Sequence, residues 1–207
     1  MEWKRLFGFG KRTEYKENIG ELAIQLGFTE EALNVLNRIA KAELTPFYRS
    51  DLYSDGVSKA VGLSLQINEG EAERTVMELQ TELKPFGLLA FICEGNGKKS
   101  RVGIIKGQDQ FDILKVQQTN GDNYDISNED VITKLRIWHH KHPFIIIGAD
   151  YDWVEAIFTE IPDAGKIKAF AKELYKFCPD IVDQGTGTVE ELIEELNESG
   201  RLYLWWD

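Results

Sequence analysis

Cysteine and long apolar runs are scarce in this sequence of 207 residues. The two cysteines, Cys93 and Cys178, lie far apart and in no Cys-x-x-Cys or Cys/His spacing. We therefore expect two reduced, buried thiols and neither a disulfide framework nor a zinc site. The longest apolar runs, 88–93 and 144–149, have the length of a strand. A transmembrane helix needs roughly 20 apolar residues, so no membrane-spanning segment is predicted.

The N-terminal residues also lack an apolar stretch of secretory length and a small-residue cleavage site, which predicts a cytoplasmic protein. Basic residues between Lys4 and Lys16 are interleaved with aromatic ones and would suit an anionic membrane surface. Gly8 and Gly10 interrupt any helix there. We therefore favour a frayed tail and expect no membrane association.

Positive charge is scarce as well. Lysine and arginine number 24 against 35 aspartates and glutamates, a formal net charge of -11. Affinity for nucleic acid comes largely from lysine and arginine that displace counterions, so we expect no nucleic-acid binding. An acidic surface steers association with basic molecules, which makes a basic protein the expected partner.

The three histidines, His139, His140 and His142, stand together just before Pro143. No cysteine or carboxylate stands at ligand spacing from them, and cationic side chains are favoured at the C-terminal end of a helix. We therefore predict no metal site and no cofactor. A Ser/His/Asp or Cys/His nucleophile is not indicated either, so no catalytic residue is assigned.

Helical periodicity and strand alternation divide the first half of the chain into short elements. Thr29 is a suitable N-cap, and Asn96-Gly97 is a turn that favours a hairpin. The expected order is a helix over 30–43, an irregular stretch from Pro46, a strand over 61–67, a helix over 71–84, and strands over 88–93 and 102–106.

The second half continues this alternation. Ser127 with Asp130 is close to a capping box, Thr188 with Glu191 is a capping box, and Gly200 is suited to end the last helix. The expected order is an ambiguous segment over 110–118 with helix slightly favoured, a helix between Ser127 and Pro143, strands over 144–149 and 153–159, a helix between Pro162 and Cys178, a loop, a helix over 189–197 and a strand over 202–206.

These elements predict an α+β protein, with a mixed β-sheet, helices packed on it and an N-terminal helical segment before it. We divide the chain into a tail and helical segment over 1–50, a strand-helix-strand-hairpin region over 51–107 and an α+β domain over 108–207. The alternative is that 51–207 forms one compact domain.

A series of motifs lies in the second half: Thr119–Ser127, Ile147–Trp153, Phe177–Asp180, Asp183–Thr188 and Leu202–Asp207. Together they resemble the bacterial family known as domain of unknown function 4253. The resemblance covers roughly the second half of the chain, and it implies no known reaction, ligand or catalytic residue. From the first motif we take Asn120 and Tyr124 as candidate binding residues.

Asp150 and Asp152 flank Tyr151 at the predicted end of a strand. A bent turn would bring the two carboxylates together as paired acids or as ligands of a hard cation. The alternative is that the two aspartates cap a hairpin in solvent, which is a common place for aspartate.

The segment Asp183–Thr188 contains two glycines directly before a predicted helix, where backbone amides are able to bind an anion. The alternative is a simple turn between two helices, with Thr188 as N-cap and Asp183 repelling phosphate. We keep Asp183, Gln184 and Thr186 as binding candidates.

Trp205 and Trp206 adjoin in the last predicted strand and therefore point to opposite faces of the sheet. One of them belongs to the core, and the other is covered by a helix or marks a contact surface. The sequence leaves open which tryptophan has which role.

Charge and the missing catalytic residues favour a non-catalytic protein-interaction module that binds a basic partner, for instance by neutralising a basic toxin. The alternative is a small-ligand-binding protein or an enzyme with an Asp/Gln/Thr pocket at the ends of the strands. The two hypotheses differ in whether those side chains converge on one concave site.

Overall fold

The computed structural model describes residues 18–48, 59–95 and 97–207. The basic tail, residues 54–56 of the expected irregular stretch and Asn96 of the expected hairpin lie outside these ranges. The elements are α1 (Ile19–Gln25), α2 (Glu30–Ala40), β1 (Thr45–Tyr48), β2 (Ala60–Asn68), α3 (Glu69–Leu83), η1 (Lys84–Phe86), β3 (Leu88–Gly95), β4 (Lys99–Lys106), α4 (Asp112–Gln117), η2 (Asp122–Tyr124), α5 (Asn128–Lys141), β5 (Phe144–Ala149), β6 (Trp153–Phe158), α6 (Ala164–Phe177), η3 (Ile181–Thr186), α7 (Val189–Ser199) and β7 (Arg201–Trp205).

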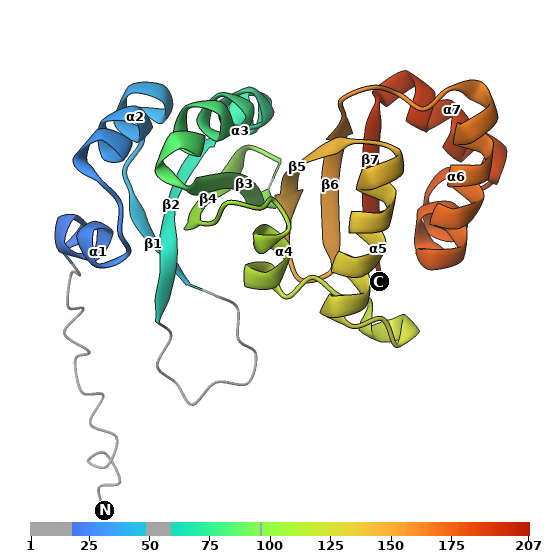
Figure 1. The fold of residues 1–207 in the computed structure, drawn as a ribbon, viewed down its shortest axis with the longest axis horizontal. Helices are drawn as coiled ribbons and strands as arrows, with labels where there is room; N and C mark the ends of the chain where they lie inside the picture. Colours follow the sequence, from blue (N-terminus) through green and yellow to red (C-terminus); the bar gives the residue numbers. More distant parts are fainter. Residues whose placement is uncertain (1–17, 49–58, 96) are drawn as a thin grey trace, which may run out of the picture.

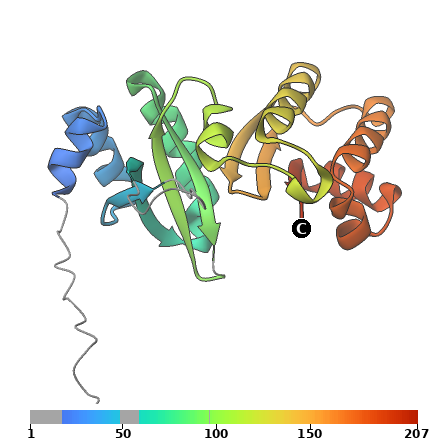
Figure 2. The same ribbon diagram turned by 90° about the horizontal axis from the view of Figure 1, so that it is seen from below.

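The strands of the described residues form one mixed sheet in the order β1-β2-β4-β3-β5-β6-β7. Neighbouring strands pair antiparallel, except that β3 and β5 run parallel. Figures 1 and 2 place α1 and α2 at one end of the molecule and α6 and α7 at the other, with the sheet between them. The predicted α+β class, with its N-terminal helical segment, is confirmed.

Helices cover both faces of this sheet. Phe144 and Ile146 of β5 belong to a hydrophobic cluster that includes residues of α4, α5, α6 and α7. Ile145 and Ile147 instead pack in a second cluster with α1, α2 and α3. Successive side chains of a strand point to opposite faces, so the two clusters lie on opposite sides of β5. Within the described ranges no helix has both the length and the apolarity that a bilayer span requires.

Three segments differ from the sequence prediction. Strand β1 occupies Thr45–Tyr48, where the sequence predicts an irregular stretch, and Pro46 is tolerated because an edge strand needs fewer backbone donors. Helix α1 was not predicted, since its seven residues are too few for a clear periodic signal. Residues Ile181–Thr186 form the π-helix η3 rather than a loop. The ambiguous segment at 110–118 contains helix α4, as slightly favoured.

Most of the predicted helix caps are confirmed, and two details differ. The Thr29 side chain caps α2, Ser127 and Asp130 form a complete capping box at α5, and Thr188 caps α7. Thr188 and Glu191 do not form a complete capping box, because the Glu191 carboxylate accepts from the Thr188 hydroxyl and not from its backbone amide. Helix α2 ends at Ala40 rather than at residue 43. Gly200 ends α7 with a φ of 63°, a left-handed conformation that glycine adopts without steric cost.

The parallel junction between β3 and β5 has a single pair of register partners, Ile92 and Gly148. Beside it, a side chain takes the place of backbone pairing. The Gln80 Nε2 group on α3 donates to the carbonyls of Ala90 in β3 and Ile146 in β5, each at 2.8 Å. This one amide therefore bridges the two strands where they diverge.

A second glutamine completes the same edge of β5. Gln110 Oε1 accepts from the Ile146 amide at 2.8 Å, and its Nε2 donates to the Phe144 carbonyl at 3.2 Å. Farther along, Gln117 Nε2 donates to the Ala149 carbonyl at 2.7 Å. Side-chain amides thus satisfy much of the β5 edge that faces β3.

We predict that Gln80→Leu destabilises the protein by about 2 kcal/mol, because two carbonyls at the junction lose their donor while the side-chain volume is nearly kept. Urea denaturation measures this as a lower midpoint with an unchanged slope. Gln66→Leu on β2 is the matched control, since the exposed Gln66 side chain makes no hydrogen bond to another described residue. A loss at Gln80 no larger than that at Gln66 would show that the bridge is dispensable.

Candidate functional site

Several of the motif segments meet around Trp206. Its side chain is 3% exposed, and its backbone amide donates to the Asp152 carbonyl at 2.9 Å. The indole Nε1 donates to the Phe177 carbonyl at 3.4 Å, and the rings of Phe177 and Trp206 meet edge to face. Gly121 lies against the indole so closely that a Cβ at this position would be 2.8 Å from it. Trp206 therefore joins three segments that are distant in sequence.

Asp180 makes the main polar contacts in this part of the fold. Its carboxylate is 2% exposed and accepts three hydrogen bonds, from the Tyr124 hydroxyl at 2.5 Å, from Gln184 Nε2 at 3.0 Å and from the Asp207 amide at 2.9 Å. A buried carboxylate is tolerated only when it is hydrogen-bonded in this way. Asp180 ends the motif Phe177–Asp180, but it was not among the site residues predicted from the sequence.

The hydrogen bonds also set the protonation of this group. Burial by itself would raise the pKa of Asp180, but the bonds from Tyr124, the Asp207 amide and Gln184 outweigh it and hold the pKa below its ordinary value. The hydrogen bond to Asp180 also raises the pKa of Tyr124 to about 12. At neutral pH the pair is therefore a carboxylate and a neutral phenol, which is a stable hydrogen bond rather than an acid-base couple.

Asn120 and Asp150 also hold backbone in place. Asn120 is buried, donates to the Gln118 carbonyl at 2.9 Å and accepts from the Asp122 amide at 2.9 Å. Asp150 accepts from the Tyr151 amide at 2.8 Å, and burial raises its pKa above the ordinary value. Asp152 is exposed, and its side chain has no hydrogen-bond partner among the described residues. Asp150 therefore caps the hairpin, as the alternative stated, but it does so while partly buried, and the Asp152 side chain takes no part in the cap.

The candidates of the segment before α7 have three separate sets of partners. Asp183 accepts a hydrogen bond from the Tyr175 hydroxyl at 2.8 Å, and Gln184 donates to Asp180. The Thr186 hydroxyl donates to the Thr188 carbonyl at 3.1 Å. Acidic residues occupy the first turn of α7, and Glu191 lies 2.8 Å from the Thr188 hydroxyl. These contacts give the segment a structural role, and the acidic first turn opposes anion binding there.

The two tryptophans are separated as the sequence requires. Trp206 follows the strand and is buried, whereas Trp205 ends β7 on the opposite face and is half-buried. The Trp205 ring lies so close to Gly185 of η3 that a Cβ there would be 2.7 Å away, so η3 covers part of this tryptophan. The Trp205 ring stacks at 5.3 Å from Tyr203, and Tyr203 stacks at 6.0 Å from Trp153 of β6. Tyr203 is 42% exposed. Trp153, Tyr203 and Trp205 thus form one aromatic patch, which we call the outer aromatic face.

Carboxylates surround this patch. Burial and the negative charges of Glu155 and Asp152 raise the pKa of Tyr203 above its ordinary value. Glu155 lies opposite Tyr203 in the β6–β7 register and is paired with Arg201 at 2.7 Å. The sequence analysis did not select Trp153, Glu155 or Tyr203, although strand alternation places each of them on the same face as Trp205.

The cysteines fit the prediction of reduced core residues. Both are free and buried, and burial raises the pKa of the Cys93 and Cys178 thiols to about 12. A protonated thiol is a poor nucleophile and metal ligand. Across 18–48, 59–95 and 97–207, no group of three or more His, Cys, Asp or Glu side chains is arranged to hold a metal ion.

This geometry defines a mixed-sheet α+β protein whose second half is organised around Trp206 and Asp180. The family described as domain of unknown function (DUF4253) matches residues 101–207, from within β4 to Asp207, which is more than half of the chain. The protein belongs to this family, as its motifs indicated. Comparison with curated proteins gives no match, and comparison with solved structures gives none either.

We predict that Asp180→Asn destabilises the fold by about 2 kcal/mol at neutral pH, because the hydrogen bonds of a buried carboxylate are replaced by weaker ones. Asp183→Asn is the control, since Asp183 is exposed and accepts one side-chain hydrogen bond. Denaturant unfolding of both variants measures the difference.

The pH dependence follows from the lowered pKa. The charge of Asp180 stabilises the fold at pH values above its ordinary pKa of 3.8, and this contribution disappears as the pH falls through the lower folded-state pKa. The gap between wild type and Asp180→Asn should therefore stay constant between about pH 7 and pH 5 and shrink below pH 3.8. A gap that grows on acidification would contradict this account.

Proposed function

We propose that this protein is a non-catalytic interaction module that binds a basic protein segment on the outer aromatic face. The observation that carries the proposal is the stack of Trp153, Tyr203 and Trp205, with Tyr203 at 42% exposure in its centre. Tryptophan and tyrosine are the residues most enriched among the energetic centres of protein interfaces.

The charges next to the stack select the partner. Asp152 is exposed and makes no ion pair with another described residue, and it lies next to Trp153 in the chain. Aromatic rings beside a free carboxylate favour lysine and arginine, through cation–π contacts and ion pairs. The net charge of -11 adds long-range attraction for a basic molecule.

The residues proposed for a ligand pocket support this choice over an enzyme. Asp150, Asp183, Gln184 and Thr186 bond to separate neighbours within the fold rather than to one another. Their polar atoms are therefore engaged in holding backbone and the C-terminal segment.

The proposal predicts that Tyr203→Ala weakens binding of a short lysine- and arginine-rich peptide by about tenfold, the loss of an interface centre of somewhat more than 1 kcal/mol. Tyr48→Ala is the matched control. Tyr48 lies on β1 at the opposite edge of the sheet and is 39% exposed, close to the value for Tyr203. Titration calorimetry measures both affinities, and thermal melts check that both variants fold.

A charge variant tests the electrostatic part of the proposal. Asp152→Asn should weaken binding by a few-fold and reduce its salt dependence, whereas Glu30→Gln on α2 should change neither appreciably. Equal effects at Tyr203 and Tyr48, or at Asp152 and Glu30, would mean that the peptide binds the acidic surface without a site, and the proposal would fail.

A further inference from the structure

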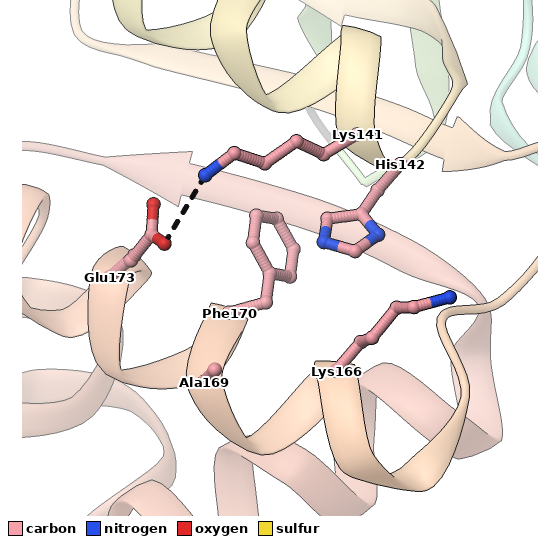
Figure 3. Close-up of a pocket in the computed structure, with 6 residues that line it drawn as sticks. All are labelled: Lys141, His142, Lys166, Ala169, Phe170 and Glu173. Atoms are coloured by element: carbon pink, nitrogen blue, oxygen red, sulfur yellow. Dashed lines mark ion pairs between the residues drawn. The ribbon is translucent and has the colours of Figure 1, made fainter.

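The junction of α5 and α6 forms an open cavity of about 400 Å³. It shares no lining residue with the outer aromatic face. Its lining is cationic and apolar, and Figure 3 shows the rings of His142 and Phe170 between the side chains of Lys141 and Lys166. Ala169 and Glu173 complete the lining. The volume suits a small molecule rather than a macromolecule.

His142 points into this cavity without a partner. The residue is 9% exposed, its ring lies 4.8 Å from the ring of Phe170, and its imidazole makes no hydrogen bond to any described residue. No side-chain nitrogen or oxygen of the described residues is both buried and unpartnered, so the unpaired imidazole nitrogens of His142 reach the solvent in the cavity and are accessible to a ligand group.

The imidazole is held close to two cations and two carboxylates. Burial and the nearby charges of Lys141 and Lys166 lower the pKa of His142, while Glu173 and Asp163 act in the opposite direction. The imidazole is therefore neutral at pH 7 and offers one N–H donor to a ligand.

The two helices that form the cavity carry a net positive charge, opposite in sign to the net charge of the whole protein. Helices α5 and α6 together contain seven lysine and arginine residues against three carboxylates, a local charge of +4 in a chain of -11. The basic residues of the N-terminal tail are therefore not the only local concentration of positive charge, as the sequence had suggested. The residues concerned are Lys134, Arg136, Lys141, Lys166, Lys168, Lys172 and Lys176.

The Glu173 carboxylate on the cavity wall already has hydrogen-bond and ion-pair partners. Glu173 accepts from Trp138 Nε1 at 3.0 Å and pairs with Lys141 at 3.5 Å and with Lys134 at 3.9 Å. Lys166 on the opposite wall pairs with Asp163 at 2.9 Å. Lys134, Lys141 and Lys166 thus face two carboxylates, which leaves an excess of one positive charge beside the cavity.

We propose that this cavity binds a small organic anion, a phosphate or carboxylate group on an apolar body. His142 donates to the anionic group, Lys166 and Lys141 supply the charge, and Phe170 with Ala169 contacts the apolar body. The site is independent of the proposed protein-binding surface, so either can fail without the other.

Phenyl phosphate and benzoate are the probes, and the imidazole signals of the histidines in an NMR titration are the readout. Saturable shifts of the His142 signals with a roughly millimolar Kd are expected for fragments of this size. His139 and His140 are internal controls outside the cavity lining. The tighter of the two probes identifies the preferred anionic group.

Two further compounds separate charge from apolar contact. Benzyl alcohol retains the ring without the anion, and inorganic phosphate retains the anion without the ring. Each should bind at least about fivefold more weakly than phenyl phosphate, because each lacks one of the two contacts.

Lys166→Gln should weaken binding of phenyl phosphate by about fivefold or more, since a charge-assisted hydrogen bond is lost. Lys168→Gln, on the same helix but outside the cavity lining, should change it by less than about twofold. Both lysines are exposed, so neither variant is expected to unfold the protein. Absence of His142 shifts with both anionic probes, or equal losses at Lys166 and Lys168, would overturn the proposal.

Discussion

The junction between β3 and β5 is the constraint on which the sheet depends. Strands on either side of it pair along most of their length, but here only Ile92 and Gly148 are register partners. Buried carbonyls without partners cost about as much as lost hydrogen bonds, so a gap in the ladder has to be filled. Gln80 and Gln110 supply the missing donors and acceptor, and the two halves of the chain remain one sheet.

Most elements of this fold are predictable because each has a local signal in the sequence. The caps of α5 and α7 and the alternation in β6 need only neighbouring residues. Strand β1 has no such signal, because it exists through pairing with β2 and through the contact of Phe47 with Phe91 at 5.7 Å. The glutamine bridge is equally hidden, since Gln80 meets a carbonyl 66 positions away.

The candidate site was less predictable, because the type of a residue does not indicate which hydrogen-bond partner it will have in the fold. Asn120, Tyr124 and Gln184 have the chemistry of ligand contacts, and in the fold their hydrogen bonds go to backbone or to Asp180. Asp180 has no distinctive spacing, so its role follows only from burial. Tyr203 was within reach, since alternation from Trp205 places both on one face of β7.

Strand alternation also explains how one acidic chain supports two proposed sites of opposite preference. In β6, Ala156 faces the cluster that includes α5 and α6, whereas Trp153 and Glu155 point to the other side of the sheet. The excess of lysine on α5 and α6 therefore lies across the sheet from the outer aromatic face. Under the two proposals, the helices repel a basic protein and the aromatic face attracts it, whereas a small anion experiences the reverse. The net charge of -11 conceals this division, because it sums over surfaces that the sheet keeps apart.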